Sequence, residues 1–363
     1  MSEELISLCM ITKNEESCIK DALLSVKSVV HEIIVVDHNS SDLTVHIAND
    51  FGARVFSRKW DDSFANARNY SIEQAMFPNI LIMDADEILV SDHEALKIAC
   101  SKINSELNMA ARVEVENKTE DVAVSTWITR LIPNRPEFRY RGRIHEQIVW
   151  NNQPPRTWDS SIKIEHSGYQ LTEIERKNKT ERNLELLLVE LSKAPNNPYT
   201  LFQIGRTYEQ RHYWELARDY YMKSKDFIDE QSRPIYYSTL LLHLSKCLIQ
   251  LKDWQRFMEI INVAIENYPD YTDLYYMYGV GIIEARNANW FSEIPRVFTN
   301  CLIIGEPDGR RYETIRGVGS YLAHYNLGLY YELLGNTSLS LFHYTQSHEM
   351  GFALAKSRMN RFQ

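Results

Sequence analysis

Apolar runs that end in polar residues alternate with helical patterns through the first part of the chain. The first run, 6–11, stops at a polar turn, and a second run, 32–36, stops at Asp37. Gly52 ends the helical pattern that follows and precedes a third apolar run, 53–56. Short apolar runs without polar alternation are typical of strands buried on both faces of a parallel sheet. The alternation of strand and helix patterns therefore predicts βαβ units with right-handed crossovers.

The pattern changes near residue 171, after which helical periodicity predominates. A small residue is followed at a constant spacing by tryptophan in three places, Gly205/Trp214, Ser245/Trp254 and Gly281/Trp290, and a fourth copy, Gly328/Thr337, keeps only the small residue. Repeats of apolar helix, small residue, short turn and apolar helix predict a solenoid of stacked helix pairs. We therefore predict an α/β domain over residues 1–170 and an all-α repeat domain over 171–363.

Residues 305–319 interrupt the repeat spacing before the final copy. The segment is either an ordinary insertion, which we favour, or a lid that reaches an active site. Tyrosines are abundant in the repeats, and we expect most of them in the core between repeats.

The apolar run 80–83 ends abruptly in three carboxylates, Asp84, Asp86 and Glu87. Open α/β sheets bind ligands at the carboxyl ends of their strands. Carboxylates crowded at such an edge repel one another, and a divalent cation with oxygen ligands removes that cost. The alternative is a strand followed by a solvated acidic turn or a helix N-cap, and the Asp-x-Asp pattern alone does not decide between them.

Polar residues also follow the other predicted strands. Asn14 and Glu15 follow the first, and Asp37 follows the second. Three such positions at corresponding strand ends predict a ligand-binding crevice, in which the carboxylate of Asp37 suits a ribose hydroxyl or a base N–H. The alternative is helix capping by Asp37, Ser40 or Asp42.

Arg68 lies in a predicted helix that Ser63 or Asp62 can cap. Its guanidinium offers a planar fork of donors matched to a carbonyl or a phosphate. The alternative is a surface salt bridge to Asp61 or Asp62, which is worth little in energy.

Bulk properties narrow the class of protein. A chain of 363 residues with 44% hydrophobic and 25% charged residues is ordinary for a soluble protein of two domains. A net charge of −9 argues against general binding to nucleic acid or anionic membranes. We expect no membrane-spanning segment and no signal peptide. The five cysteines are scattered, which predicts neither disulfides nor a zinc site and favours the cytoplasm.

Four motifs give the chain a specific resemblance. They are Leu8-Cys9-Met10-Ile11-Thr12-Lys13-Asn14-Glu15-Glu16, Ile33-Ile34-Val35-Val36-Asp37, Phe64-Ala65-Asn66-Ala67-Arg68-Asn69 and Met83-Asp84-Ala85-Asp86-Glu87. In order and spacing they resemble family-2 glycosyltransferases, most closely the branch with a C-terminal tetratricopeptide array that includes bacteriocin S-glycosyltransferases. The resemblance implies a GT-A (Rossmann-like) fold, a nucleotide-activated sugar donor, a divalent metal and inversion at the anomeric carbon. One departure is the turn His38-Asn39-Ser40, which lacks the family's glycine, although Asn39 tolerates left-handed backbone.

The resemblance also assigns residues to the donor. It implies that the nucleoside and base are held by Thr12, Asn14, Glu15, Asp37 and Arg68. Asp84, with Ala85 beside it, would contact the ribose or a metal-bound water. Asp86 would ligate Mn²⁺ or Mg²⁺ on the diphosphate, with Asp84 and a late histidine, His166, as further metal ligands. The alternative for His166 is a hydrogen-bonded surface residue at a strand end.

An inverting transfer needs a base near the acceptor. In the resembling branch a His-Glu pair follows a glycine-containing loop at this position, which makes Glu146 the candidate base. His145 would orient the acceptor, or would itself be the base if Glu146 were structural. Arg141 and Arg143 would offset phosphate charge. The alternative is a ladder of Arg–Glu salt bridges on an exposed strand.

These observations favour a metal-dependent inverting hexosyltransferase that moves a sugar from a UDP-sugar to a hydroxyl or thiol. The repeats would present a peptide or protein acceptor, or would pair two subunits into a homodimer. One alternative acceptor is a lipid-linked glycan or a surface polysaccharide. A second alternative, from a different class, is an adaptor whose repeats bind a partner while the nucleotide domain is inactive.

Overall fold

The computed structural model describes residues 4–118, 123–166, 173–229, 231 and 233–362. The chain divides into two compact units, Met1–Lys193 and Ala194–Gln363. The first unit therefore includes the helix that follows the predicted domain boundary at residue 170, and that boundary stays a prediction.

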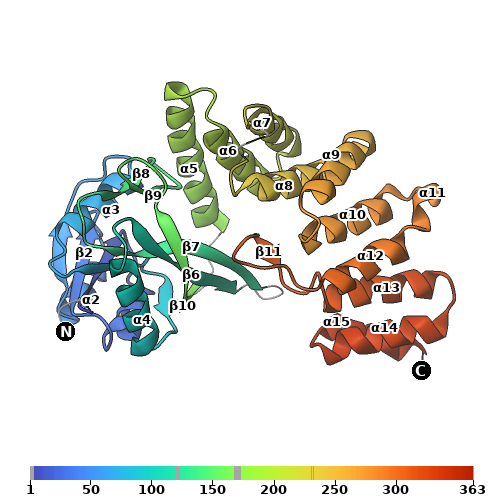
Figure 1. The fold of residues 1–363 in the computed structure, drawn as a ribbon, viewed down its shortest axis with the longest axis horizontal. Coiled ribbons are helices and arrows are strands. Elements are labelled where there is room, and N and C mark those ends of the chain that lie inside the picture. Colours follow the sequence, from blue (N-terminus) through green and yellow to red (C-terminus); the bar gives the residue numbers. More distant parts are fainter. Residues whose placement is uncertain (1–3, 119–122, 167–172, 230, 232, 363) are drawn as a thin grey trace. The chain divides into compact units, whose positions relative to one another are not determined.

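The first unit is built on one large sheet (Figure 1). Its strands lie in the order β3-β2-β1-β4-β7-β6-β10-β5. Their bounds are β1 (Ile6–Thr12), β2 (Glu32–Asp37), β3 (Arg54–Ser57), β4 (Asn79–Ile82), β5 (Glu87–Leu89), β6 (Met109–Lys118), β7 (Ala123–Pro133) and β10 (Arg156–His166). Strands β1 to β4 are parallel to one another, whereas β7 runs antiparallel to both β4 and β6. A separate hairpin consists of β8 (Phe138–Arg141) and β9 (Gln147–Trp150).

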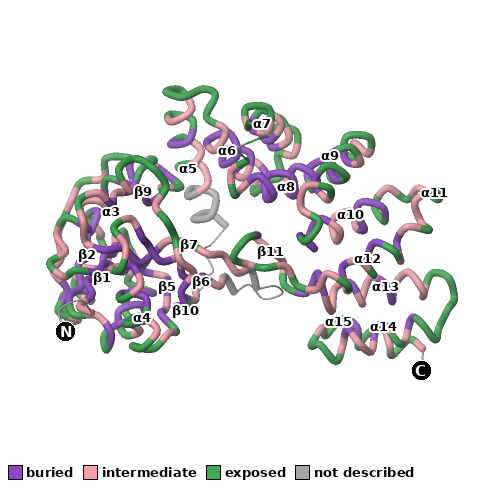
Figure 2. Tube along the Cα trace, viewed as in Figure 1, coloured by how far each residue is buried: buried purple, intermediate pink, exposed green. Residues whose placement is uncertain are grey.

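Alternate residues of the central strands enter two different hydrophobic clusters. In β1, Leu8 and Met10 point into one cluster and Cys9 into the other. The first cluster is completed by α1 (Ile19–Val26), α2 (Thr44–Asp50) and α4 (His93–Asn104), and the second by α3 (Phe64–Glu73) and the β8–β9 hairpin. Because both faces of the sheet are covered, the central strands are buried (Figure 2), as their unbroken apolar runs predicted. The predicted α/β class is confirmed. The unit ends with α5 (Glu173–Lys193).

The second unit is almost entirely helical, which confirms the predicted change of class. Its elements are α6 (Pro198–Gln210), α7 (Trp214–Asp226), α8 (Tyr237–Gln250), α9 (Trp254–Asn267), α10 (Thr272–Ala285), α11 (Ala288–Phe291), α12 (Ile294–Ile304), β11 (Thr314–Ile315), α13 (Tyr321–Leu333), α14 (Thr337–Glu349), α15 (Ala353–Met359) and the 3-10 turn η1 (Asn360–Phe362). Contacts pair α6 with α7, α8 with α9, α10 with α12 and α13 with α14, and successive pairs also touch. This is the stacked helix-pair arrangement of a tetratricopeptide-like solenoid.

Glycines let the paired helices approach closely. A Cβ added at Gly205 would lie 2.6 Å from the ring of Tyr221, and one at Gly328 would lie 2.6 Å from the ring of Tyr344. In the third pair the residue that faces the partner helix is Gly279, which meets Phe298, whereas the predicted Gly281 meets Phe257 of the preceding pair. A small residue thus allows close packing either between the two helices of one pair or between neighbouring pairs.

Among the described residues, no helix combines the length and apolar character that crossing a membrane requires.

The contact between Gly205 and Tyr221 predicts a large effect for Gly205→Val. The added methyl groups must displace a tyrosine ring whose side chain is fully buried, so we expect the unfolding free energy to fall by about 2 kcal/mol or more. Urea unfolding followed by circular dichroism measures this. Gln210→Val is the matched control, since Gln210 is exposed on the same helix and should change stability little. Equal effects at the two positions would contradict the packing described.

Candidate active site

The turns after β1 and β2 are bonded to each other. Asn14 and Asn39 both adopt left-handed backbone, with φ of 56° and 57°. The side chain of Asn14 accepts a hydrogen bond from the Ser41 amide (2.8 Å), and the Asn14 amide donates to the Ser40 hydroxyl (2.8 Å). Asn39 therefore supplies the conformation that the missing glycine would have supplied.

The carboxylate of Asp37 is used within this turn. It accepts hydrogen bonds from the Thr12 hydroxyl (3.0 Å), the Ser40 amide (2.8 Å) and the Ser40 hydroxyl (2.5 Å), and Asp37 is only 1% exposed. These contacts hold the turn itself and do not cap α2 (Thr44–Asp50), so for Asp37 the helix-capping alternative is wrong. Direct contact of Asp37 or Thr12 with a nucleoside stays a prediction, as it does for Glu15, whose amide donates to the Thr44 hydroxyl (2.7 Å).

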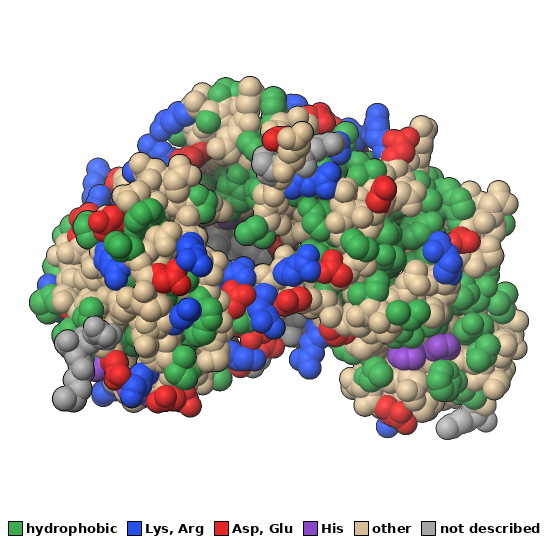
Figure 3. Space-filling model, viewed as in Figure 1, with side chains coloured by type: hydrophobic (Ala, Val, Ile, Leu, Met, Phe, Trp, Pro, Cys, Tyr) green, Lys and Arg blue, Asp and Glu red, His purple; other side chains and the backbone are tan. Residues whose placement is uncertain are grey.

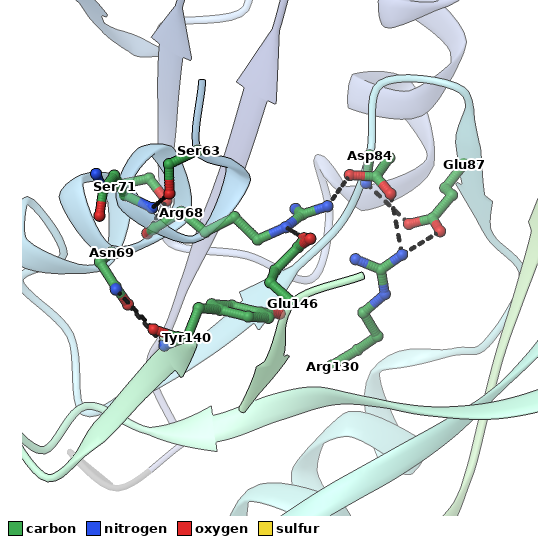
Figure 4. Close-up of polar contacts among 10 residues, drawn as sticks. Ser63, Arg68, Asn69, Ser71, Asp84, Glu87, Arg130, Tyr140 and Glu146 are labelled. Atoms are coloured by element: carbon green, nitrogen blue, oxygen red, sulfur yellow. Dashed lines mark hydrogen bonds and ion pairs between the residues drawn. The ribbon is translucent and has the colours of Figure 1, made fainter. Parts of the chain in front are cut away.

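Arg68 connects three elements that are far apart in the sequence (Figure 4). From α3, its Nε donates to Glu146 Oε1 (2.6 Å), and its Nη2 donates to Asp84 Oδ1 (2.8 Å) just after β4. The guanidinium is 5.6 Å from the centroid of the Tyr140 ring, and the side chain is only 8% exposed. Three predicted site residues, Arg68, Asp84 and Glu146, are thus in direct contact. Arg68 is buried and bonded to Asp84 and Glu146, so the alternative of a surface salt bridge to Asp61 or Asp62 is wrong.

A second arginine, Arg130 of β7, completes the arrangement around Asp84. Its Nη2 donates to Asp84 Oδ2 (3.0 Å) and to Glu87 Oε1 (2.6 Å). Glu87 Oε2 in turn accepts from the Asp84 amide (2.8 Å). Both oxygens of Asp84 are therefore held by guanidinium groups. Sequence reasoning assigned no role to Arg130 or Glu87; the available signal was an arginine within a half-apolar strand.

Two guanidinium groups face three carboxylates here, those of Asp84, Glu87 and Glu146. Burial opposes the charged form of Asp84, but Arg68 and Arg130 outweigh it and hold the pKa of Asp84 well below its ordinary value. Burial, together with the charge of Asp84, raises the pKa of Glu87 to about 7 in spite of Arg130. Of the three carboxylates, Glu87 is therefore the one whose charged form its buried surroundings oppose most clearly.

Local sequence explains why Arg68 and Glu146 meet. Ser63 caps α3 by accepting from the Asn66 amide (3.2 Å), as predicted. Asn69 exchanges two hydrogen bonds with the backbone of Tyr140 in β8 (3.0 and 2.7 Å), which docks the hairpin on the helix. Gly142 then turns the chain at a φ of 96°, a conformation that favours glycine, and Glu146 follows. The adjacent His145 also has a positive φ, 50°.

Asp86 points to a different partner from Asp84. Its Oδ2 lies 3.1 Å from His166 Nε2, and the two side chains are 28% and 34% exposed. The antiparallel pairing of β5 with β10 puts His166 opposite Glu87, which explains how a residue 80 positions away reaches the acidic tip. The structure therefore divides the predicted metal set: Asp86 and His166 lie together, while Asp84 faces the arginines.

The described residues contain no group of three or more His, Cys, Asp or Glu side chains arranged to hold a metal ion. Mg²⁺ and Mn²⁺ sites in nucleotide enzymes commonly use one or two protein ligands and complete their shell with substrate phosphates and water. The Asp86–His166 pair fits such a site. Asp84 as a ligand stays a prediction, since both its oxygens accept from arginines.

Two adjoining hollows lie beside this network, against α3 and β8. One, of about 400 Å³, is lined by Arg58, Asn66, Asn69, Tyr70, Glu73, Arg139 and Arg141. The other, of about 220 Å³, is lined by Ser63, Ala65, Asn66, Asn69, Tyr140, Arg141, Gly142, Arg143 and Glu190. The predicted basic residues Arg141 and Arg143 thus border a hollow next to the loop that carries Glu146.

Comparison with known proteins defines the class of this site. Residues 7–172 match the family described as glycosyl transferase family 2. Sequence relatives include a TPR repeat-containing protein of Synechococcus elongatus, 31% identical over 55% of this chain and 51% of its own length. The SPbeta prophage-derived glycosyltransferase SunS of Bacillus subtilis is 28% identical over 78% of this chain and 68% of its own length. An uncharacterized glycosyltransferase of Rickettsia typhi is 42% identical, over 23% of this chain and 28% of its own length.

Among solved structures, MamA aligns with a TM-score of 0.39 at 18% identity, covering 50% of this chain and 94% of its own. YrrB, described as a TPR protein with an unusual peptide-binding site, aligns with a TM-score of 0.39 at 16% identity, covering 52% of this chain and 87% of its own. Likeness at this level says nothing about binding partners.

The N-terminal part of the chain is therefore a glycosyltransferase domain. More specifically, residues 7–172 are a family 2 glycosyltransferase domain, joined to tetratricopeptide-like helical repeats. The sequence predicted both a family 2 glycosyltransferase domain and a tetratricopeptide-like repeat region, and both predictions are confirmed. The chain's match spans about half the length of the Synechococcus relative, so the activity of the whole protein is a matter of proposal.

The contacts of Arg130 predict that Arg130→Met destabilises the first unit. The buried carboxylate of Glu87 and the partly buried one of Asp84 lose their shared partner, so we expect a loss of about 3 kcal/mol in unfolding free energy. Adding Glu87→Gln should recover part of the loss, because one of the unpaired charges is then removed. Arg112→Met is the control: the Arg112 side chain, which pairs with Asp159, is 20% exposed, against 8% for Arg130, so its loss should cost less. Equal losses for Arg130→Met and Arg112→Met would contradict this interpretation.

Proposed function

We propose that the protein is a metal-dependent inverting glycosyltransferase that moves a hexose from a UDP-sugar to a hydroxyl or thiol of a peptide or protein. The observation that carries the proposal is the joint position of two side-chain sets around the tip after β4. Asp86 and His166 offer a metal site, and Glu146 is held through Arg68 to Asp84, all within a family 2 glycosyltransferase domain.

The donor would lie across the carboxyl ends of β1, β2 and β4. The bonded turns after β1 and β2 make a rigid edge there, since Asn14, Ser40 and Ser41 are linked to one another. Thr12, Asn14, Glu15, Asp37 and Arg68 are the residues proposed for the nucleoside side, with Asp84 and Ala85 at the ribose. Asp84 would act with its position fixed by two arginines.

Asp86 and His166 would hold the divalent cation. A bound Mn²⁺ or Mg²⁺ supplies positive charge that neutralises the diphosphate as it departs. Their partial exposure leaves both side chains accessible to a metal–diphosphate. Imidazole is a ligand for transition metals, and this makes Mn²⁺ the better match of the two.

Glu146 would be the base. As the acceptor oxygen or sulfur forms a bond to the anomeric carbon, its proton passes to the carboxylate of Glu146. The bond from that carbon to the diphosphate oxygen breaks, and the electron pair leaves with UDP. Arg68 fixes Glu146 through Oε1, and this orients the carboxylate before the acceptor arrives. His145, next to it, would position the acceptor.

The acceptor proposed is a peptide or protein, on two grounds. SunS, a similar protein over most of this chain, is a glycosyltransferase, and the repeats provide extended helical faces suited to a chain-like partner. Basic and acidic side chains are interspersed on the face seen in Figure 3. Five buried free cysteines fit a reducing compartment, and we propose the cytoplasm, with the repeats as the candidate homodimer contact.

Asp86→Asn tests the metal site directly. Titration of UDP in a calorimeter, with and without Mn²⁺, should show metal-enhanced binding for the natural protein and at least about a tenfold loss of that enhancement in the variant. Asp50→Asn is the matched control, because Asp50 also faces a histidine, His46, but on the exposed surface of α2. If Asp86→Asn kept the full Mn²⁺ enhancement of UDP binding, Asp86 would not be a metal ligand. Absence of any enhancement in the natural protein would favour the adaptor.

A further inference from the structure

The segment between α12 and α13 forms a loop that is closed at its neck. A Cβ added at Gly319 would lie 2.0 Å from the carbonyl carbon of Gly305, so the two strands of the neck are in backbone contact. The side chain of Glu306 accepts from the Gly317 amide (3.0 Å) and from the Ser320 hydroxyl. The two ends of the loop are therefore held together by contacts that do not involve its tip, as in a compact surface loop.

The tip of this loop, Tyr312–Ile315, runs back over the repeats and contacts the first helix of three successive pairs, α6, α8 and α10. Figure 1 shows the segment around β11 extending away from α12 and α13. The carboxylate of Glu313 accepts two hydrogen bonds from Arg206 of α6 (3.1 and 2.8 Å). The same carboxylate lies 3.9 Å from His243 Nε2 of α8.

Residues on either side of Glu313 have their own partners at α10. The ring of Tyr312 stacks on Tyr271, with centroids 4.2 Å apart and planes 5° from parallel. Asp273 accepts from the Thr314 hydroxyl (2.7 Å) and the Ile315 amide (2.9 Å). Four consecutive residues thus occupy an aromatic contact, a carboxylate site and a main-chain anchor, which is how an extended peptide is recognised.

The carboxylate of Glu313 is contacted by two cationic side chains, Arg206 and His243. His243 Nδ1 is 2.8 Å from Glu209, which also bonds Lys246 (2.8 Å) and Tyr221 (2.7 Å). Burial opposes the charged form of His243, but the bonds to Glu209 and Glu313 outweigh it and raise the pKa of His243. Burial likewise opposes the charge on Glu313, yet His243 and Arg206 lower its pKa to about 2. Removal of Glu313 would leave the partly buried guanidinium of Arg206 without the carboxylate that accepts both of its hydrogen bonds.

We infer that the α6–α8–α10 face is a recognition site for an extended peptide in which an aromatic residue directly precedes an acidic one. The chain's own Tyr312–Ile315 occupies this site as an internal ligand, and a partner segment with the same aromatic–acidic sequence exchanges with it. The neck closes at Gly305 and Gly319 through its own contacts, and exchange requires the buried ring of Tyr312 to leave its stack on Tyr271. This site is separate from the proposed sugar transfer and does not depend on it.

The test uses the full chain with residues 308–316 replaced by a Gly-Ser linker of equal length. The probe is a fluorescein-labelled peptide with the natural sequence of 308–316, Asp-Gly-Arg-Arg-Tyr-Glu-Thr-Ile-Arg, followed by fluorescence anisotropy. We expect saturable binding to the loop-replaced protein and at least about tenfold weaker binding to the intact protein, whose tethered tip competes at high effective concentration.

Variants of the protein and the peptide identify the contacts. In the loop-replaced protein Arg206→Ala should weaken peptide binding about tenfold or more, because a bidentate charged contact is lost. Arg256→Ala is the matched control, since Arg256 lies on the second helix α9 with its side chain 56% exposed, and should leave binding unchanged. Peptides carrying Glu313→Gln or Tyr312→Ala should each bind about tenfold more weakly.

Failure of the peptide to bind a loop-replaced protein with natural helical circular dichroism would overturn the inference, as would binding that is indifferent to Arg206. If the loop-replaced protein does not fold, Glu313→Gln in the intact chain takes its place. We then expect faster hydrogen exchange over 308–316 together with new binding of the natural peptide. Faster exchange without peptide binding would show that the tip is only a brace and would refute the proposal.

Discussion

The contact of Arg68 with Asp84 and Glu146 is the interaction on which the first unit's site depends. It ties helix α3 to the end of strand β4 and to the segment between β8 and β9, and the Arg68 side chain is buried. A buried guanidinium is tolerated only with carboxylate partners, and buried carboxylates only with cations. If Arg68 moved, Glu146 would lose its hydrogen bond from Arg68 Nε, and Asp84 would keep only its bond from Arg130. The position of Arg68 and the charge balance of the two carboxylates therefore depend on each other.

The same constraint explains why neighbouring acids behave differently. Asp84 is fixed between Arg68 and Arg130, whereas Asp86, two residues on, lies beside His166 at the end of β10. The chain turns at Ala85 and Asp86, so the carboxylates of Asp84 and Asp86 reach different partners: Asp84 contacts the arginines and Asp86 contacts His166. Glu87 balances the cluster by its raised pKa. Three neighbouring carboxylates thus have three different surroundings: Asp84 between two arginines, Asp86 beside a histidine, and Glu87 buried against Arg130.

Sequence patterns predicted the parts of this arrangement that local chemistry determines. Unbroken apolar runs located β1, β2 and β4, and polar residues at their ends located the edge where Arg68, Asp84 and Glu146 meet. Arg130 was missed because its role depends on β7 lying antiparallel beside β4, a pairing that no local pattern in β7 encodes. Strand β6 was missed for a related reason, since its sequence is mixed and polar. In the repeats, Gly279 took the role expected of Gly281 because spacing does not fix which helix a face meets.

A double-mutant cycle between Arg68→Met and Glu146→Gln, measured as urea unfolding of the first unit, tests the central contact most directly. Since each change removes the same 2.6 Å bond, the two effects should be non-additive, with a coupling of about 1–3 kcal/mol. Effects that add to within about 0.5 kcal/mol would show that Arg68 does not hold Glu146, and the proposed base would lose its support.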